Sequence, residues 1–274
     1  MAIISIARES GAYGDEIGEM LAQRLPGTLL NKELLEKRFK EFGVNLKTLQ
    51  RYDERRPGFW ASFSAEQDVY LHILKTVVYE EMNKGACVIL GRGGNILLQD
   101  LANCLRIRLV APFEVRVQRL MEQLSCTKKK AEKTLETSDK DRTGFCRFHF
   151  NSEWAAPTEY QLVLNTACFS AEQCVEMLLS CSRQLIGPEQ EAAGHQQLQD
   201  RILAQNIIES IIFQKNIPVQ FLEVQCSNGT ATLFGVVSSP NIARAAEEAT
   251  QAVSGVKAVD NRIQVVREQP LRRM

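Results

Sequence analysis

The residues best suited to chemistry stand near the start of the chain, between a short apolar run and a segment of helical spacing. The run over residues 3–6 is rich in β-branched residues, and apolar residues recur at helical spacing over 17–25. Between them lies a loop that contains Arg8, Gly11 and Gly14. A loop that opens a helix presents backbone N–H groups and the positive end of the helix dipole, which together bind phosphate. The stretch therefore predicts a strand, a loop and a helix with a phosphate site at their junction.

The loop departs from the P-loop fingerprint G-x-x-x-x-G-K-[ST], in which the lysine reaches the β/γ-phosphates and the hydroxyl binds Mg²⁺. With Gly11 placed mid-loop, Gly14 stands at the lysine position and Asp15 at the hydroxyl position. Two such glycines also occur in ordinary strand-to-helix turns. The loop taken alone leaves both interpretations open.

Two further segments contain arginines that could bind a nucleotide. Arg92 comes just after a buried apolar run at 86–90, where ligands bind in α/β sheets, and its planar fork suits phosphate. The alternative is an arginine that pairs with a local carboxylate. Phe59 and Trp60, which follow two arginines, either cover a nucleotide base or form a core edge or a dimer surface.

The β-α alternation over residues 1–185 predicts an α/β domain with a parallel sheet covered by helices on both faces. Residues 186–197 are polar and glutamine-rich with Gly and Pro, which predicts a linker. Residues 198–268 follow an αββαβ pattern, with a hairpin signal at Ser227-Asn228-Gly229. We therefore expect two domains joined by a linker.

Composition narrows the class of protein. The chain has 274 residues, of which 45% are hydrophobic and 24% charged, and its 33 basic side chains balance 33 acidic ones. No net charge favours nucleic acid, so we expect no nucleic-acid partner. The eight cysteines show no zinc spacing or disulfide framework, and no apolar run has the length of a membrane span. These features predict a cytoplasmic protein.

Six segments resemble, in order, motifs of the cytidylate kinase-like family of P-loop proteins. They are the opening run 4–17, Asn31-Lys32-Glu33-Leu34, Leu90-Gly91-Arg92-Gly93, Val110 to Arg116, Asp139-Lys140-Asp141-Arg142 and Val163-Leu164-Asn165-Thr166. The resemblance implies ATP with Mg²⁺ as the donor, a nucleotide-like acceptor such as CMP, and a homodimer. It implies donor binding by Arg8, Gly11, Ala12, Tyr13, Gly14, Asp15 and Glu16, with Asp15 also the metal ligand. It implies acceptor binding by Gly91, Arg92, Asn95 and Asp141. Catalytic lid arginines would be Arg116, Arg119 and Arg142, which would neutralise the transferred phosphoryl group.

The C-terminal segment resembles the BON domain. Its residues 229–237 match the hairpin motif G-x-V/A-x-L-x-G-x-V, and residues 253–263 match V-x-G-V-x-x-V-x-N-x-I. This resemblance implies that the segment is a binding module, with a protein partner or a phospholipid surface as its ligand. Six Lys or Arg balance six Asp or Glu over residues 198–267, so a strongly basic lipid-binding face is not supported.

Two function classes stay open. The first is a phosphotransferase. The second is a catalytically degenerate kinase-like sensor or scaffold whose BON unit makes the functional contact. The second is favoured by departures from the family pattern: Tyr13 replaces a loop glycine, Asp15 an arginine, and Asn31 an acidic residue.

Overall fold

The computed structural model describes residues 2–44 and 65–266. Phe59 and Trp60 lie outside these ranges. Contacts divide the chain into one unit over Met1–Gly194 and a second over His195–Met274. None of the helices in the described ranges combines the length and the apolar character needed to cross a membrane.

The first unit is built on a five-stranded parallel sheet, which confirms the predicted fold class. Its strands are β1 (Ile3–Arg8), β2 (Gly27–Leu30), β3 (Ala86–Leu90), β4 (Cys104–Val110) and β5 (Leu162–Asn165), in the order β2-β3-β1-β4-β5. The central strand β1 aligns Ile6 with Leu90 of β3 and with Ile107 of β4. All three side chains are buried, as parallel strands covered on both faces require.

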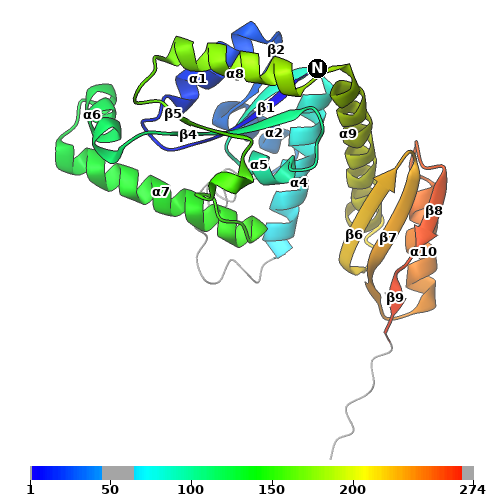
Figure 1. Ribbon diagram of the computed structural model, residues 1–274. Coiled ribbons are helices and arrows are strands. Elements are labelled where there is room, and N and C mark those ends of the chain that lie inside the picture. The colour runs from blue at the N-terminus through cyan, green and yellow to red at the C-terminus, as the bar shows by residue number, and fades with distance from the viewer. Residues whose placement is uncertain (1, 45–64, 267–274) are drawn as a thin grey trace, which may run out of the picture. The chain divides into compact units, whose positions relative to one another are not determined.

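Helices cover both faces of this sheet (Figure 1). They are α1 (Gly14–Arg24), α2 (Lys32–Glu41), α4 (Ala65–Asn83), α5 (Gly94–Leu97), α6 (Phe113–Leu124), α7 (Lys128–Phe150) and α8 (Ala171–Leu185). Ile17 and Leu21 of α1 pack with Val175 and Leu178 of α8 against the sheet, while α4 and α5 lie on the other side. This packing fixes the start of α1 directly beyond the carboxyl end of β1.

The segment predicted as a linker, residues 186–197, is helical from Pro188 onward. It forms the first half of α9 (Pro188–Ile208), in which Pro188 takes the first-turn position where its missing N–H costs nothing. A Cβ added at Gly194 would lie 2.1 Å from Oδ1 of Asn103, so this glycine marks close packing within the first unit. The glycine and proline that suggested a loop therefore have positional roles in and before a helix.

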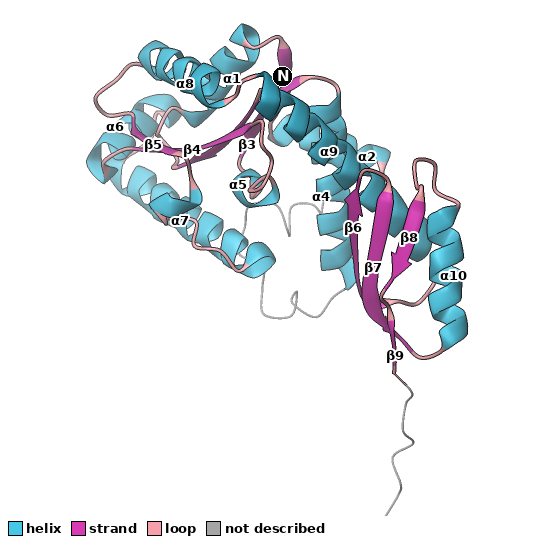
Figure 2. Cartoon of the chain, turned by 45° about the vertical axis from the view of Figure 1, so that its right-hand side comes forward, coloured by secondary structure: helices cyan, strands magenta, loops and turns pink. Residues whose placement is uncertain are grey.

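The second unit is a small α+β domain with its own core (Figure 2). After α9 and a π-helical turn (Glu209–Gln214) come β6 (Gln220–Ser227), β7 (Thr230–Val237), α10 (Pro240–Gln251), β8 (Ala258–Asn261) and β9 (Gln264–Val265). Asn228 and Gly229 both have positive φ, 51° and 89°, as the predicted hairpin turn requires. The last strand of the predicted αββαβ pattern is split in two, because the Asn261 side chain accepts a hydrogen bond from the N–H of Ile263 and forms a local turn.

A β-bulge interrupts the pairing of β6 with β7 between Gln220 and Glu223. Gly235 of β7 lies opposite, and a Cβ added there would lie 2.6 Å from Cγ1 of Val219. The second glycine of the hairpin motif is thus required by close approach of the two strands.

Candidate functional site

The loop between β1 and α1 has a backbone shape that leaves the start of the helix open. Gly11 has φ 78°, and Tyr13, the N-cap of α1, is left-handed at φ 59° and ψ 24° without a side-chain cap. The first N–H groups of a helix have no intrahelical acceptor, and Tyr13 supplies none. A Cβ added at Gly14 would lie 2.4 Å from Cγ of Arg8. Arg8 therefore passes directly over the first turn of α1.

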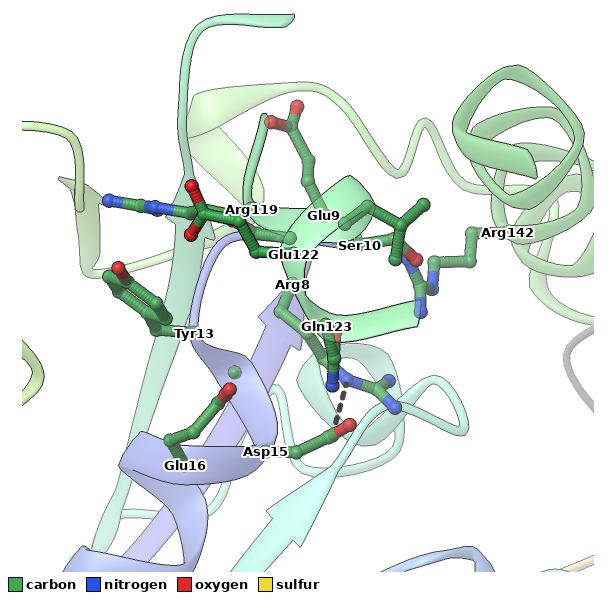
Figure 3. A pocket seen from close by; sticks show the side chains of 13 residues that line it. Arg8, Glu9, Ser10, Tyr13, Asp15, Glu16, Arg119, Glu122, Gln123 and Arg142 are labelled. Atoms are coloured by element: carbon green, nitrogen blue, oxygen red, sulfur yellow. Dashed lines mark hydrogen bonds and ion pairs between the residues drawn. The ribbon is translucent and has the colours of Figure 1, made fainter. Parts of the chain in front are cut away.

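A pocket of about 440 Å³ opens over this loop (Figure 3). It is lined by Arg8, Glu9, Ser10, Gly11, Tyr13, Gly14, Asp15, Glu16, Arg119, Leu120, Glu122, Gln123 and Arg142. The fold thus brings together eight of the residues predicted from the sequence to bind the donor or act in the lid. Ala12 is fully buried in the core beneath the loop and does not line the pocket.

Glu9 is the polar anchor beneath this pocket, and the sequence interpretation missed it. Its Oε1 accepts from Nη2 of Arg108 at 3.1 Å, and its Oε2 accepts from the N–H of Ala111 at 3.2 Å. Arg108 is itself buried, stacks on Trp154 at 4.5 Å and donates to the carbonyl of Ala155. The only signal in the sequence is a carboxylate next to Arg8 in the loop.

Arg116, predicted as a lid arginine, is buried and lines neither this pocket nor the one described below. Its Nε donates to the carbonyl of Ala111 at 3.1 Å and lies 3.4 Å from Oε2 of Glu9. Its Nη1 lies 3.0 Å from Oδ2 of Asp139 on α7. Arg116 therefore joins the loop to α7 through two carboxylates.

Arg119 lies one turn further along α6 and clamps the loop from the pocket side. Its Nη1 donates to the carbonyl of Gly11 at 3.1 Å and to Oγ1 of Thr166 at 3.0 Å, and its Nη2 donates to the Thr166 carbonyl at 2.8 Å. Its guanidinium carbon lies 3.7 Å from the centre of the Tyr13 ring. These contacts hold Arg119 at the end of β5, where it orders the loop.

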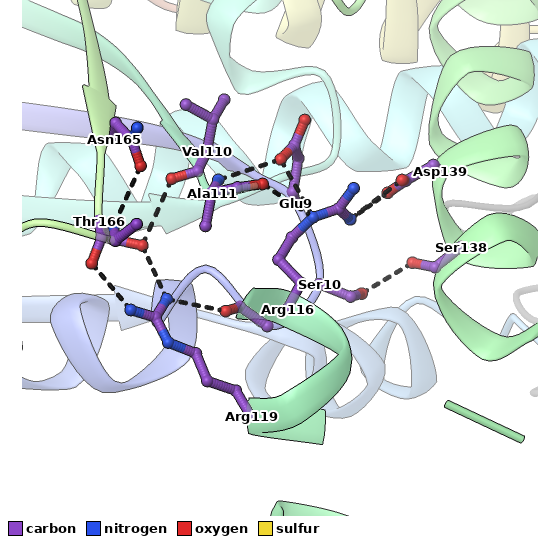
Figure 4. Close-up of polar contacts among 12 residues, drawn as sticks. Glu9, Ser10, Val110, Ala111, Arg116, Arg119, Ser138, Asp139, Asn165 and Thr166 are labelled. Atoms are coloured by element: carbon purple, nitrogen blue, oxygen red, sulfur yellow. Dashed lines mark hydrogen bonds and ion pairs between the residues drawn. The ribbon is translucent and has the colours of Figure 1, made fainter. Parts of the chain in front are cut away.

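Arg142 approaches the loop from α7. Its Nη1 donates to Oγ of Ser10 at 3.0 Å, and Ser10 also shares a hydrogen bond of 2.9 Å with Ser138 (Figure 4). Asp141, one residue earlier on α7, lines neither pocket. Of the three predicted lid arginines, Arg142 and Arg119 face the first pocket.

A second pocket of about 410 Å³ adjoins the first and shares Arg8 and Asp15 with it. Its remaining lining residues are Glu19, Asn31, Lys32, Glu33, Glu36, Leu90 and Arg92. Asn31 is engaged structurally, because its side chain caps α2 by accepting from the N–H of Leu34. Arg92 is nearly fully buried, although it lines this pocket.

The turn that presents Arg92 is strained. Gly91, Arg92 and Gly93 all have positive φ, at 74°, 57° and 68°. The left-handed conformation costs a non-glycine residue ~1–2 kcal/mol, and such strain concentrates at functional sites. A Cβ at Gly93 would lie 2.2 Å from the ring of Phe150, so the turn is fixed by packing.

Gly91 and Asn95, which were predicted with Arg92, do not line the second pocket. Asn95 is 3% exposed on α5, and its Nδ2 has no hydrogen-bond partner among the described residues. Its backbone carbonyl accepts from Arg106. The structure thus places Asn95 beneath the Arg92 turn.

Asp15 is the residue predicted from the sequence to bind Mg²⁺. In the described part of the chain, no group of three His, Cys, Asp or Glu is placed to bind a metal. Asp15 has a largely exposed carboxylate, 3.8 Å from Nε of Arg8. Because Mg²⁺ is commonly bound by one or two carboxylates together with substrate phosphates, Asp15 fits this mode.

Two solved structures resemble part of this chain. A crystal structure of an uncharacterized protein from Eubacterium ventriosum superposes with TM-score 0.54 and 23% identity, over 67% of this chain and 98% of that one. Shikimate kinase from Acinetobacter baumannii gives TM-score 0.39 and 17% identity, over 66% and 92%.

A curated relative, uronate isomerase from Corynebacterium glutamicum, is 27% identical over 92 residues. The match spans 34% of this chain and 18% of that enzyme. The BON domain model matches residues 199–267, and the model of the cytidylate kinase-like family matches residues 3–167. The chain therefore belongs to the cytidylate kinase-like family and carries a C-terminal BON domain.

Proposed function

We propose that the first unit is a phosphotransferase that binds ATP with Mg²⁺ in the first pocket and a nucleotide-like acceptor, such as CMP, in the second. One observation carries the proposal: the two pockets adjoin and share Arg8 and Asp15. Phosphoryl transfer requires a donor and an acceptor to meet in line beside groups that neutralise charge. Arg8 stands where the two would meet.

The roles of the side chains follow from their positions. The N–H groups at the start of α1 face the donor phosphates. Arg142 would exchange its bond to Ser10 for the transferred group, and the buried Arg92 would hold the anionic group of the acceptor. Bound Mg²⁺ would neutralise phosphate charge, with Asp15 as its protein ligand.

Calorimetric titration with ATP and with CMP, each with and without Mg²⁺, tests the proposal. We expect Arg8→Ala to weaken ATP binding and Arg92→Ala to remove CMP binding. Arg24→Ala is the matched control, because Arg24 ends α1, is half exposed and pairs with Glu176. Loss of a buried charged contact to phosphate weakens binding roughly tenfold or more. Equal affinities in all variants, or no binding by either nucleotide, would contradict the proposal.

A second candidate function is a kinase-like sensor or scaffold without turnover. It is favoured by the exposed acidic side chains of the first pocket, Asp15, Glu16 and Glu122, which equal its three arginines in number. Carboxylates near the phosphate positions oppose anion binding unless a cation intervenes. Saturable ATP binding without phosphoryl transfer to CMP would favour this candidate.

We propose that the BON unit contacts a protein partner or a phospholipid surface. Its balanced charge favours a protein partner, because anionic lipid attracts strongly basic faces. Co-sedimentation of the full chain with phosphatidylserine vesicles separates the two cases. A homodimer, the other association that the family implies, is tested by sedimentation equilibrium.

A further inference from the structure

The guanidinium group of Arg119 stacks on the ring of Tyr13 at the first pocket. The guanidinium carbon of Arg119 lies 3.7 Å from the centre of the Tyr13 ring, and both residues line the first pocket (Figure 3). Planar guanidinium groups stack on aromatic rings, nucleobases included. The flat face of Arg119 is therefore occupied by a side chain of the same protein.

Other contacts hold both Arg119 and Tyr13 in this stacked arrangement. The Arg119 guanidinium is fixed in its plane by hydrogen bonds to Gly11 and to two oxygens of Thr166. Tyr13 is held at φ 59° as the N-cap of α1. That left-handed conformation is disfavoured for a bulky residue, so the ring is kept in place against local backbone preference.

We propose that Tyr13 takes the stacking face of Arg119 that a nucleobase would otherwise use, so that the first pocket recognises the phosphates of its ligand and discriminates weakly among bases. The inference rests on the proposed function, because it assumes that a polyphosphate binds at the loop. The specificity-determining residue would be Tyr13, which departs from the family pattern.

Calorimetric titration in the presence of Mg²⁺, using ATP, GTP and inorganic tripolyphosphate, tests the inference on the full chain. The variants are Tyr13→Asn, which removes the ring and tolerates a left-handed backbone, and Tyr13→Phe, which keeps the ring. Tyr13→Gly is a second ring-free variant, since glycine adopts this φ without steric cost. Thermal unfolding of each variant checks that it folds.

In the natural protein, we expect the three affinities to agree within about threefold, a free-energy difference smaller than one good contact. Removing the ring exposes the guanidinium face, so Tyr13→Asn and Tyr13→Gly should raise the affinity for ATP relative to tripolyphosphate by about tenfold. Tyr13→Phe should match the natural protein. The ratio of ATP to tripolyphosphate isolates the base, because any change of the loop itself affects both ligands.

Two results would overturn the inference alone: ATP binding tenfold or more above tripolyphosphate in the natural protein, or an unchanged or lower ratio in the ring-free variants. Absence of binding by all three ligands in every variant would overturn the proposed function together with the inference. The two failures are therefore distinguishable.

Discussion

Replacing Glu9 by glutamine tests the role of the buried anchor beneath the loop. Both carboxylate oxygens of Glu9 accept from donors: Oε1 from Arg108, and Oε2 from the N–H of Ala111 beside Arg116. An amide has one oxygen and one NH₂ group, so in either orientation the NH₂ group of the substituted side chain would face another donor. The substitution preserves shape and removes both the charge and half of the acceptors.

The expected loss follows from the burial of the partners. Side chains of Arg108 and Glu9 are 8% and 16% exposed, so solvent screens their interaction little. Leaving one member of a buried ion pair without its partner costs ~3–5 kcal/mol. Glutamine still offers one acceptor, and Arg116 keeps Asp139. We therefore expect a smaller loss for the first unit, about 2–3 kcal/mol of unfolding free energy, which is the size of one hydrogen bond to a charged group.

Urea unfolding followed by tryptophan fluorescence measures this loss. The chain has two tryptophans, and a Trp60→Phe background leaves Trp154, which stacks on Arg108 within the same network. Fluorescence of Trp154 reports the first unit, as a two-unit chain requires. Glu122→Gln is the control, because Glu122 is exposed and should change stability by less than ~0.5 kcal/mol. If Glu9→Gln changed stability as little as Glu122→Gln, the carboxylate would carry no net stability and the reasoning would be refuted.

Two further predictions concern pH and the BON unit. Burial raises the pKa of the Cys87 thiol from 9.0 to about 12, so between these values the unfolded chain releases a proton that the native state keeps, and stability falls as pH rises. Urea unfolding at pH 8 and pH 11 should show a smaller decline for Cys87→Ala than for the natural protein; an equal decline would contradict the assignment. Gly235→Ala should destabilise the second unit by about 1–3 kcal/mol, because its Cβ would lie 2.6 Å from Val219. Hydrogen exchange of β7 measures this effect, and unchanged protection would contradict the packing argument.

The strand-loop-helix unit at the start of the chain could be predicted because local signals agree there. One continuous stretch contains the β-branched residues, the loop glycines and the helical spacing. The structure has the predicted strand and helix, and their apolar residues lie in the core. The parallel sheet follows from the same alternation repeated along the chain. Register and strand order, by contrast, depend on contacts between distant segments.

The two arginines of α6 show where sequence reasoning stops. Arg116 and Arg119 are three positions apart, so a helix places them on neighbouring parts of one face. Arg116 nevertheless reaches Glu9 and Asp139 in the interior, whereas Arg119 reaches Gly11 and faces the pocket. The partner that each one meets depends on where α7 and the end of β5 lie relative to the loop, and spacing within α6 carries no information about either position.

Glycine positions are a second place where the structure differs from the prediction made from the sequence. Gly194 was one of the residues that predicted a linker over 186–197, but it lies in a helix against Asn103. Gly91 and Gly93 flank an arginine in a left-handed turn. The sequence shows that a glycine is present. It does not show whether the glycine is there for its conformational freedom or because another part of the chain packs closely against its backbone. That distinction requires the neighbouring atoms.

Under the proposed function, the pairing of Arg8 with Asp15, which line both pockets, would link ligand binding in one pocket to ligand binding in the other. A cation that binds Asp15 releases the Arg8 side chain from this carboxylate, and an anion that binds Arg8 frees Asp15. Linkage is reciprocal. If a ligand in the first pocket changes the affinity of the second pocket by a given factor, a ligand in the second pocket changes the affinity of the first by the same factor. Under the proposed function, this single ion pair of 3.8 Å would provide heterotropic cooperativity within one unit, without a change of fold.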